Sequence, residues 1–359
     1  MRKYKPFFII FLNLFVFGLP YHAFALEVNT MTTNNFEHTT PLLRVLLITT
    51  GGTIAQGKSG TLNATDLIAQ IPALKDIAQI EVDDFIQTYS AAMTPEIQFK
   101  LAQHINTLLS TRSDLAGIVI THGTDSLEET AFMLDLLMDD PRPIVFTAAQ
   151  RTPDTPDSDG PRNLEYAFRT VGSKTAQDKG VMVVLNEDIH SARFVKKTHT
   201  SAIEAFKSGK KGMIGTIDNG TVIFYNAPLN RLTIPTQAIE PNVDLIKLAV
   251  GDNGKFIHHA IKTQTAGLVI EAFGRGNMPL AVTEAVLAAR QAGLIVVVTS
   301  RTGEGRVEIS NQLKQAGVIA GEDLDGLKAR ILLITALGAT RDIKTIQHWF
   351  NLAGGVRTE

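Results

Sequence analysis

The chain has 359 residues, 44% of them hydrophobic and 19% charged, with a net charge of −2 and no cysteine. This length and composition allow two ordinary domains with sizeable cores. The near-neutral charge and the lack of a long basic run argue against a nucleic-acid partner, and the absence of cysteine excludes disulfides.

The first 25 residues read as a secretory signal peptide. Basic residues precede an apolar stretch over residues 7–20, and residues 23–25 have the A-x-A form of a cleavage site. The apolar stretch is shorter than the roughly 20 residues that a membrane helix needs. We therefore expect cleavage after Ala25, export to the periplasm, no membrane partner afterwards, and a mobile N-terminal arm over the polar residues 26–42.

From residue 43 onward, strand-like and helix-like segments alternate. Apolar runs of strand length occupy residues 45–48, 117–120, 144–147 and 181–185. Helical periodicity marks residues 97–109 and 127–138. Alternating strands and helices predict a mostly parallel sheet with helices on both faces. Residues 43–225 are therefore expected to form the larger N-terminal domain of an α/β protein.

A smaller C-terminal α/β domain is predicted for residues 248–359. It follows a linker over residues 226–247, which contains three prolines and little apolar periodicity. The strand candidates of this second block are residues 266–270, 294–299 and 330–335.

Two segments rich in threonine and glycine come directly after predicted strands. The first places Gly51-Gly52 before Thr53, and the second contains Thr124 and Asp125. Ligands bind at the carboxyl ends of strands in open α/β sheets, and a glycine pair lets the backbone approach a ligand closely. A helix after Thr53, or a turn around Ala149, could supply N–H groups to an anion or an oxyanion.

A simpler alternative is that these hydroxyl and carboxyl groups only cap helices. Lys197 could carry protons if it is desolvated near a carboxylate, although a solvated surface lysine is the simpler interpretation. His122 is predicted to be a buried, hydrogen-bonded histidine. His258-His259 have no acidic or cysteine companions at metal-ligand spacing, so we predict no metal site.

Both segments resemble signature motifs of the bacterial L-asparaginase/glutaminase family, of the exported type II. Thr-Gly-Gly-Thr-Ile-Ala is matched at residues 50–55, and Thr-His-Gly-Thr-Asp-Ser-Leu-Glu-Glu-Thr-Ala at residues 121–131. Further similarity lies at residues 71–78, at residues 158–164 and around Lys197. The resemblance extends over residues 43–352. It implies hydrolysis of the side-chain amide of asparagine, and often glutamine, to the acid and ammonia without a cofactor.

The resemblance also implies roles for single residues. Thr53 resembles the nucleophile that forms an acyl-enzyme, and Thr124, Asp125 and Lys197 resemble a second triad that handles the attacking water or the nucleophile's proton. Asp125 would also pair with the α-ammonium group of the substrate, and Ser90 would hold its α-carboxylate.

Subunit assembly is part of the same resemblance. The family is typically a homotetramer, a dimer of intimate dimers, in which the sites are completed across the intimate interface. Asn277 matches an asparagine that a neighbouring subunit lends to the site, and Glu304 and Glu308 are candidates for a glutamate lent in the same way.

The chain departs from the family pattern in two places. The family's first triad includes a lid tyrosine, but Gln56–Ile68 contains none, and Ala91 stands where the type II pattern has a glutamine. These departures leave open which group activates Thr53. They also leave open a glutaminase-asparaginase or an amidase of shifted preference. An exported solute-binding protein without turnover is the alternative from another functional class.

Overall fold

A computed structural model of the chain describes residues 41–57, 60–229 and 231–356. The expected signal peptide, and residues 26–40 of the expected mobile arm, lie outside the described residues. In the described part of the chain, no helix is both long enough and apolar enough to cross a membrane.

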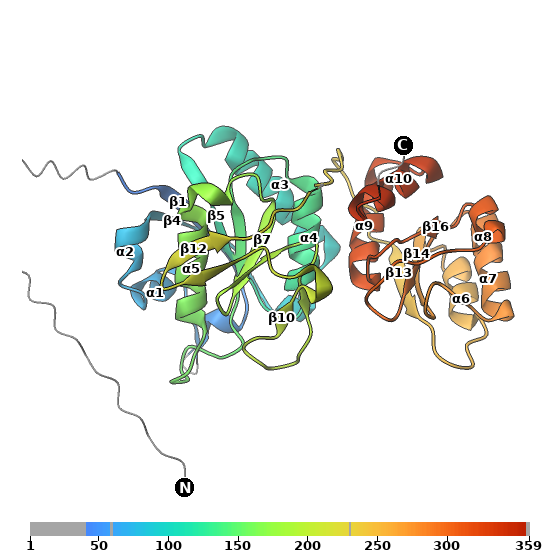
Figure 1. Cartoon of the computed structure of the whole chain (residues 1–359), viewed down its shortest axis with the longest axis horizontal. Coiled ribbons are helices and arrows are strands. Elements are labelled where there is room, and N and C mark those ends of the chain that lie inside the picture. The colour runs from blue at the N-terminus through green and yellow to red at the C-terminus, as the bar shows by residue number, and fades with distance from the viewer. Residues whose placement is uncertain (1–40, 58–59, 230, 357–359) are drawn as a thin grey trace, which may run out of the picture. The chain divides into compact units, whose positions relative to one another are not determined.

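An eight-stranded sheet is the centre of the N-terminal domain (Figure 1). Its order is β12-β11-β8-β7-β6-β5-β1-β4. Five neighbouring strands, β7, β6, β5, β1 and β4, are parallel. Strands β8, β11 and β12 continue the sheet in antiparallel pairs. The strands are β1 (Arg44–Gly51), β4 (Gln79–Thr88), β5 (Leu115–Thr121), β6 (Ile144–Thr147), β7 (Val181–Leu185), β8 (Asp188–Ser191), β11 (Gly215–Asp218) and β12 (Thr221–Phe224).

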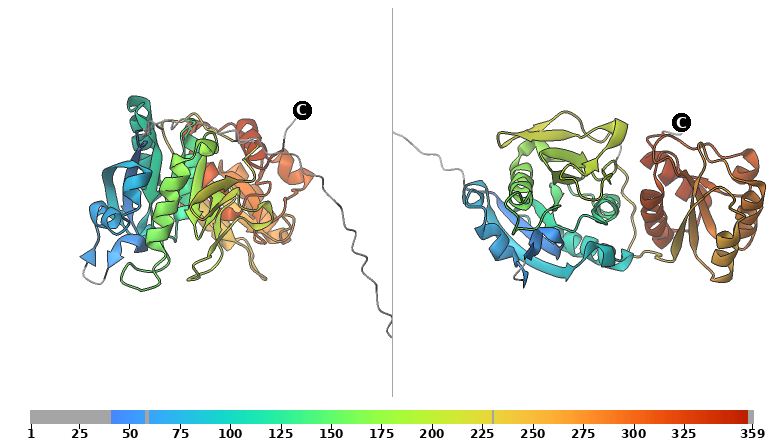
Figure 2. Two further views of the ribbon diagram at one scale, coloured as in Figure 1. Left: turned by 60° about the vertical axis from the view of Figure 1, so that its left-hand side comes forward. Right: turned by 90° about the horizontal axis from the view of Figure 1, so that it is seen from below.

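Helices cover both faces of this sheet (Figure 2). Leu46 and Ile48 of β1 belong to the same core cluster as residues of α3 and α4. Val45 and Leu47, which point the other way, belong to the cluster that contains residues of α1, α2 and α5. Burial on both faces explains why the central strands read as continuous apolar runs. The helices are α1 (Ala64–Ala69), α2 (Leu74–Ile77), α3 (Pro95–Thr111), α4 (Leu127–Leu137) and α5 (Gly160–Gly172).

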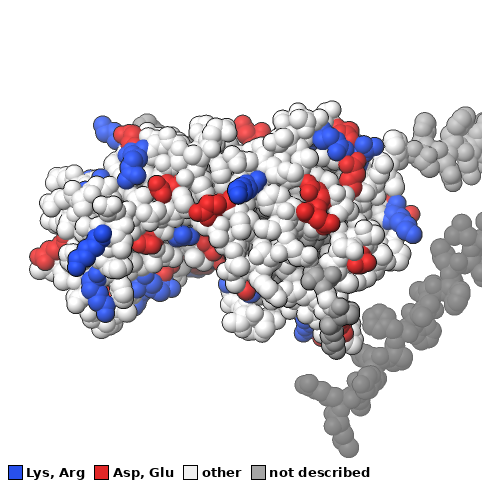
Figure 3. Space-filling view, turned by 180° about the vertical axis from the view of Figure 1, so that it is seen from behind, with Lys and Arg blue, Asp and Glu red and all other residues white. Residues whose placement is uncertain are grey.

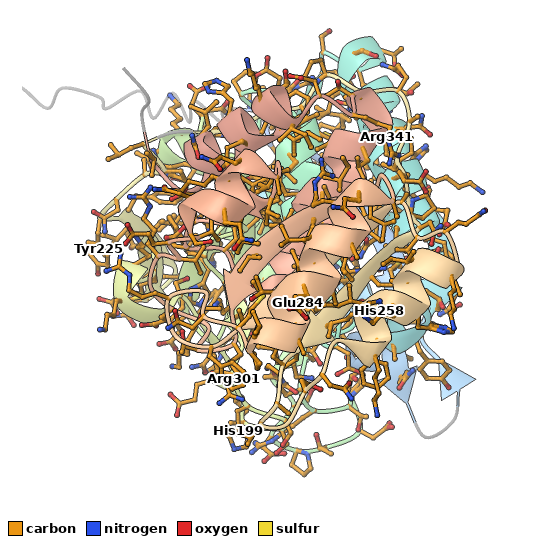
Figure 4. The ribbon with its side chains drawn as sticks, turned by 90° about the vertical axis from the view of Figure 1, so that its right-hand side faces the viewer. His199, Tyr225, His258, Glu284, Arg301 and Arg341 are labelled. Carbon is orange, nitrogen blue, oxygen red and sulfur yellow. The ribbon has the colours of Figure 1, made fainter. Side chains whose placement is uncertain are left out.

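The C-terminal domain is a smaller, fully parallel sheet of order β13-β14-β15-β16. Figure 4 shows His258 on α6 and Glu284 on α7, two helices that lie over one face of this sheet. Helix α9 packs against the sheet and also contacts α4 of the N-terminal domain. The elements are β13 (Val243–Lys247), α6 (Lys255–Lys262), β14 (Gly267–Ala272), α7 (Leu280–Gln291), β15 (Ile295–Ser300), α8 (Asn311–Gln315), β16 (Ile319–Ala320), α9 (Gly326–Ala339) and α10 (Ile343–Ala353).

The strand predicted for residues 330–335 is wrong, because these residues lie inside α9. Four consecutive residues of this helix are at most 1% exposed, namely Ile331, Leu332, Leu333 and Ile334. A helix that is buried all round shows no polar face, so its sequence loses the 3.6-residue period that identifies an amphipathic helix. Strand β13 is a second difference, since it occupies the last five residues of the range expected for the linker.

Two short antiparallel hairpins complete the fold around the sheet ends. The first, β2 (Gln56–Gly57) with β3 (Gly60–Thr61), follows β1, and the second pairs β9 (Lys196–Lys197) with β10 (Phe206–Lys207). On the face shown in Figure 3, basic and acidic side chains are interspersed.

Candidate active site

The three strands β5, β1 and β4 are neighbours in the large sheet, and their carboxyl ends meet at one edge. Thr49 is in register with Thr121, and Gly51 is in register with Thr88. The chain passes from β1 to β4 on one side and then places β5 on the other side, so β1 is a topological switch point. In open α/β sheets, ligands bind in the crevice outside such a point.

Glycines bring the segments after these strands into backbone contact. Gly51 and Gly52 have φ angles of 96° and 95°, which only glycine adopts readily. A Cβ atom on Gly52 would lie 2.5 Å from the Cα of Gly123, and one on Gly51 would lie 2.5 Å from the carbonyl oxygen of Thr88. A Cβ on Gly123 would lie 2.5 Å from Ser90 Oγ. Gly52 therefore brings the first threonine segment into contact with the second, and the close approach to a ligand stays a prediction.

Thr53 begins a single 3₁₀ turn, Thr53–Ala55, and is partly buried. The helix considered after Thr53 is this short 3₁₀ turn, and the chain then goes on into the β2–β3 hairpin. The first α-helix starts at Ala64, where Asn63 and Asp66 form a capping box. Thr53 is not a helix cap either, since Gly52 holds the N-cap position of the turn and no side chain caps it.

Lys197 joins Thr124 and Asp125 in one hydrogen-bonded group. Its Nζ donates to Thr124 Oγ1 at 2.8 Å and to Asp125 Oδ1 at 2.7 Å. The Lys197 side chain is only 15% exposed, so the solvated-lysine interpretation is wrong. The capping interpretation also fails here, because Ser126 occupies the N-cap position of α4, and its side chain makes no cap bond.

Ser90 lies against the same group, in a tight turn after β4. Its Oγ is buried and accepts a hydrogen bond from the backbone N–H of Asp125 at 3.1 Å. Its carbonyl oxygen accepts from Ser126 Oγ at 2.6 Å. A hydroxyl that accepts one bond still has its own proton to donate. Asp125 keeps 62% of its side chain exposed beside it, so a soluble ligand can reach the Asp125 carboxylate.

In the turn around Ala149, two backbone N–H groups already have a partner within the protein. The backbone N–H groups of Gln150 and Arg151 donate to the carboxylate of Asp159 at 3.1 and 3.0 Å. The expectation that this turn supplies oxyanion donors is wrong for these two amides. Sequence pattern alone missed Asp159, which also precedes α5.

Asn277 and the two glutamate candidates lie in the C-terminal domain. Asn277 is exposed in a turn in which its N–H donates to the carbonyl of Phe273 at 2.8 Å. Glu308 pairs with Arg275 at 2.7 Å, and Glu304 lies against Gly209. Among the described residues, no hydrogen bond joins any of these three to Lys197, Thr124 or Asp125. Glu304 follows Gly303, whose carbonyl accepts a hydrogen bond from Lys196.

The described tyrosines lie outside the segment that follows Thr53. Tyr225 is 58% exposed after β12 (Figure 4), and Tyr166 packs with the core on the α5 side of the sheet. Tyr89 is 70% exposed and directly precedes Ser90. It is therefore the tyrosine closest along the chain to the site.

His122 is fully buried, with Nδ1 at 2.7 Å from the carbonyl oxygen of Gly123, which confirms the prediction of a buried, hydrogen-bonded histidine. Burial lowers its pKa to about 4, from an ordinary value of 6.5. His190 is also buried, and its pKa is likewise lowered to about 4. Both side chains stay neutral in the folded protein at pH values where the unfolded chain is already protonated.

Acid is therefore expected to destabilise the fold. Above pH 6.5 these histidines are neutral in the folded and in the unfolded protein, so they do not make stability depend on pH. As the pH falls from 6.5 to 4, only the unfolded chain takes up protons at these histidines, which lowers the free energy of unfolding by about 3 kcal/mol per buried histidine. Urea unfolding of wild type and His122→Gln at several pH values checks this. The variant should show a shallower loss, and the exposed His258→Gln should match wild type. Equal pH dependence in wild type and His122→Gln would contradict the expectation.

Comparison with known proteins gives consistent matches. Residues 44–230 match the family model described as "Asparaginase, N-terminal", and residues 242–350 match "Glutaminase/Asparaginase C-terminal domain". L-asparaginase 2 of Bacillus subtilis is 34% identical over 327 residues, which cover 86% of this chain and 86% of that protein. A Haemophilus influenzae protein named "Probable L-asparaginase periplasmic" is 32% identical over 326 residues, covering 86% of this chain and 93% of that one.

A solved structure, described as a probable cytoplasmic L-asparaginase from Campylobacter jejuni, has the same fold. Its TM-score is 0.81 at 35% identity, and the match covers 86% of this chain and 98% of that chain.

Proposed function

The chain belongs to the bacterial L-asparaginase/glutaminase family, and from this premise we propose that it hydrolyses L-asparagine to L-aspartate and ammonia, with Thr53 as the nucleophile. The observation that carries the proposal is a hydrogen-bonded group in which the Lys197 ammonium donates to Thr124 and Asp125. The backbone contact between Gly52 and Gly123 places the Thr53 segment beside this group. Acyl transfer needs a nucleophile, a proton carrier and substrate anchors that converge on one point.

Thr53 Oγ attacks the amide carbon of the substrate side chain. A C–O bond forms, the C–N bond breaks, and the nitrogen leaves as ammonia after it gains a proton. Water then attacks the resulting ester, which releases aspartate and restores the Thr53 hydroxyl. Asparagine and water are thus converted to aspartate and ammonia, and the protein ends each cycle unchanged.

Lys197 prepares Thr124 for proton transfer. Its ammonium group donates to Thr124 Oγ1, so one acceptor site of that hydroxyl is occupied and the hydroxyl proton points elsewhere. A nearby positive charge also stabilises the oxygen after it has lost its proton. Thr124 can then pass a proton between Thr53, the leaving nitrogen and the attacking water. General acid–base catalysis of this kind contributes about 10²- to 10⁴-fold.

Asp125 and Ser90 fit the two charged ends of an α-amino acid. The exposed Asp125 carboxylate suits the α-ammonium group, while the Ser90 hydroxyl proton suits the α-carboxylate. The two residues are linked by the hydrogen bond from the Asp125 N–H to Ser90 Oγ. An amino-acid amide held at both ends would present its side chain to the threonines.

A glutaminase-asparaginase, or an amidase of shifted preference, is the second candidate. Ala91 is exposed beside Ser90 and leaves room where the type II pattern has a larger polar side chain. The absence of tyrosine from the segment after Thr53 favours the same alternative, since activation of Thr53 then rests on Thr124 and Lys197 or on another group.

We also propose export with cleavage after Ala25, and a homotetramer in which Asn277 completes a neighbour's site. The periplasmic name of the Haemophilus relative supports export. The exposed position of Asn277, without a bond to the Lys197 group of its own chain, supports sharing between subunits. A periplasmic chain that begins at Leu26, and a tetramer by sedimentation, are expected; a full-length cytosolic chain or a monomer with full activity would refute the respective proposal.

A coupled ammonia assay over L-asparagine, L-glutamine and D-asparagine tests the activity directly. Release from L-asparagine is expected to be the fastest, with a measurable but slower rate on L-glutamine. Faster release from L-glutamine or from D-asparagine would favour the amidase of shifted preference. Tight binding of L-asparagine without any ammonia would instead identify a solute-binding protein and overturn the proposal.

A further inference from the structure

Lys328 lies in the first turn of α9, in the C-terminal domain, and is only 1% exposed. Its Nζ donates to the carbonyl oxygen of Val195 at 2.7 Å. The same Nζ lies 4.0 Å from Glu128 Oε2 and 5.6 Å above the ring centroid of Phe132. A buried ammonium group without bonded partners is very costly, so this one must be held by the groups around it.

The groups that Lys328 touches lie next to the proposed catalytic residues. Val195 is two residues before Lys197 in the chain. Glu128 is in the first turn of α4, four residues after Thr124, and is only 7% exposed. The backbone N–H of Lys197 faces this carboxylate and lowers its pKa slightly. We call the set formed by Lys328, Glu128 and the Val195 carbonyl the Lys328 clamp.

Other contacts from the C-terminal domain hold the same segment. Lys196 Nζ pairs with Asp325 Oδ2 at 2.9 Å and donates to the Gly303 carbonyl at 2.5 Å. Arg193 pairs with Asp323 at 2.5 Å. Lys197 is therefore the one lysine of the Lys196-Lys197 pair that reaches the sheet edge, because its neighbour is tied to the C-terminal domain.

The electrostatic setting agrees with a firmly held pair. Burial raises the pKa of Glu128, and the charge of Lys328 opposes that rise. Burial likewise lowers the pKa of Lys328, against the opposing effects of Glu128 and Asp325. Each group thus favours the charged form of the other, and Lys328 is hydrogen-bonded to the backbone of the Lys197 segment at Val195.

We infer that Lys328 is a positioning residue: the C-terminal domain, through the Lys328 clamp, sets the position of Lys197 relative to Thr124 and Asp125. This inference rests on the proposed function for its catalytic consequence. The clamp joins the two separate parts of the Lys197 group, since Glu128 belongs to the helix that follows Thr124 and Val195 belongs to the segment that carries Lys197. A displacement of about 1 Å at such a group can lower a rate about 10²-fold.

The test compares Lys328→Met in two backgrounds. In the wild-type background, kcat on L-asparagine is expected to fall about 10²-fold while KM changes far less. In the Lys197→Met background, adding Lys328→Met is expected to change kcat less than about twofold, because residues that act as a unit are not additive. A purely structural role would give the same fold loss in both backgrounds, and that result would overturn the inference.

Two further variants separate positioning from stability. Leu332→Ala removes a buried side chain from the same helix but none of the polar contacts of the clamp, so kcat of the folded enzyme should stay at the wild-type value. The double variant Glu128→Gln/Lys328→Met removes both charges of the buried pair, which a fold tolerates better than the loss of one. It should fold and still show the loss in kcat. Wild-type kcat in this folded variant would overturn the inference.

Hydrogen exchange gives a readout that is independent of turnover. The amides of residues 195–198 should exchange faster in Lys328→Met than in wild type and in Leu332→Ala. Unchanged protection of this segment would contradict the clamp even if the enzyme were inactive. A wild-type chain that releases no ammonia from any amide would count against the proposed function, whereas the exchange data would still decide on the clamp.

Discussion

Thr53→Ala is expected to lower kcat on L-asparagine by roughly 10⁴-fold or more, because no acyl-enzyme can form without the attacking oxygen. The fold should be unaffected, since Thr53 is only partly buried and caps no helix. Steady-state ammonia release, with circular dichroism as the check on folding, measures the effect. KM should change little, because the proposed substrate anchors Asp125 and Ser90 are retained.

Two control variants sharpen this prediction. Thr53→Ser keeps the hydroxyl and should retain most of the activity. Thr107→Ala removes an exposed threonine on α3 whose hydroxyl only bonds the Gln103 carbonyl, and it should behave as wild type. If Thr53→Ala turned over asparagine at a rate near that of Thr107→Ala, Thr53 could not be the nucleophile.

Lys197→Met is expected to lower kcat by about 10³-fold and also to raise KM. The substitution removes the donor to Thr124 and leaves Asp125 without its ion-pair partner. Both the proposed proton transfer and the proposed anchor for the α-ammonium group should therefore be disturbed. Stopped-time ammonia assays over a range of substrate concentrations separate the two effects.

The matched control is Lys207→Met, on the strand that pairs with β9. Lys207 is 44% exposed and pairs only loosely with Glu204, at 3.2 Å, so its loss should leave kcat and KM unchanged. Equal kinetics for Lys197→Met and Lys207→Met would remove Lys197 from the mechanism and would leave Thr124 without the group proposed to prepare it for proton transfer.

Much of the fold could be predicted because its central strands are buried on both faces. Such strands read as uninterrupted apolar runs, and the predicted strands at residues 45–48 and 117–120 fall within β1 and β5. Strand β4 was not predicted. It lies at the edge of the sheet and carries Glu81, Asp83 and Asp84, so its pattern lacks a continuous apolar run.

The strand predicted within α9 was wrong for the opposite reason. Its central residues are apolar on every side, and a short run of such residues does not distinguish a buried helix from a buried strand. A local signal was nevertheless present. Asp325 accepts a hydrogen bond from the backbone N–H of Lys328 at 2.9 Å, which is the N-cap pattern that marks a helix start.

The site was predictable where its residues follow strands directly, and less so where distant segments meet. Thr53 and Thr124 could be placed at the sheet edge from the runs that precede them. Lys197, by contrast, is more than 70 residues away from Thr124, and nothing local in the sequence distinguishes it from Lys196. Only the tertiary contacts show that the two lysines point to different partners, one to the site and one to the C-terminal domain.

The central claim is that Thr53 carries the acyl group. The most direct measurement is rapid acid quenching of the wild-type protein during the first turnovers of L-asparagine, followed by peptide mapping by mass spectrometry. Acid stops both chemical steps, so that any ester present at the moment of quenching is retained. We expect an aspartyl ester on the peptide at Thr53. An aspartyl ester on another residue, with Thr53 unmodified, would contradict the assignment of Thr53 as the nucleophile.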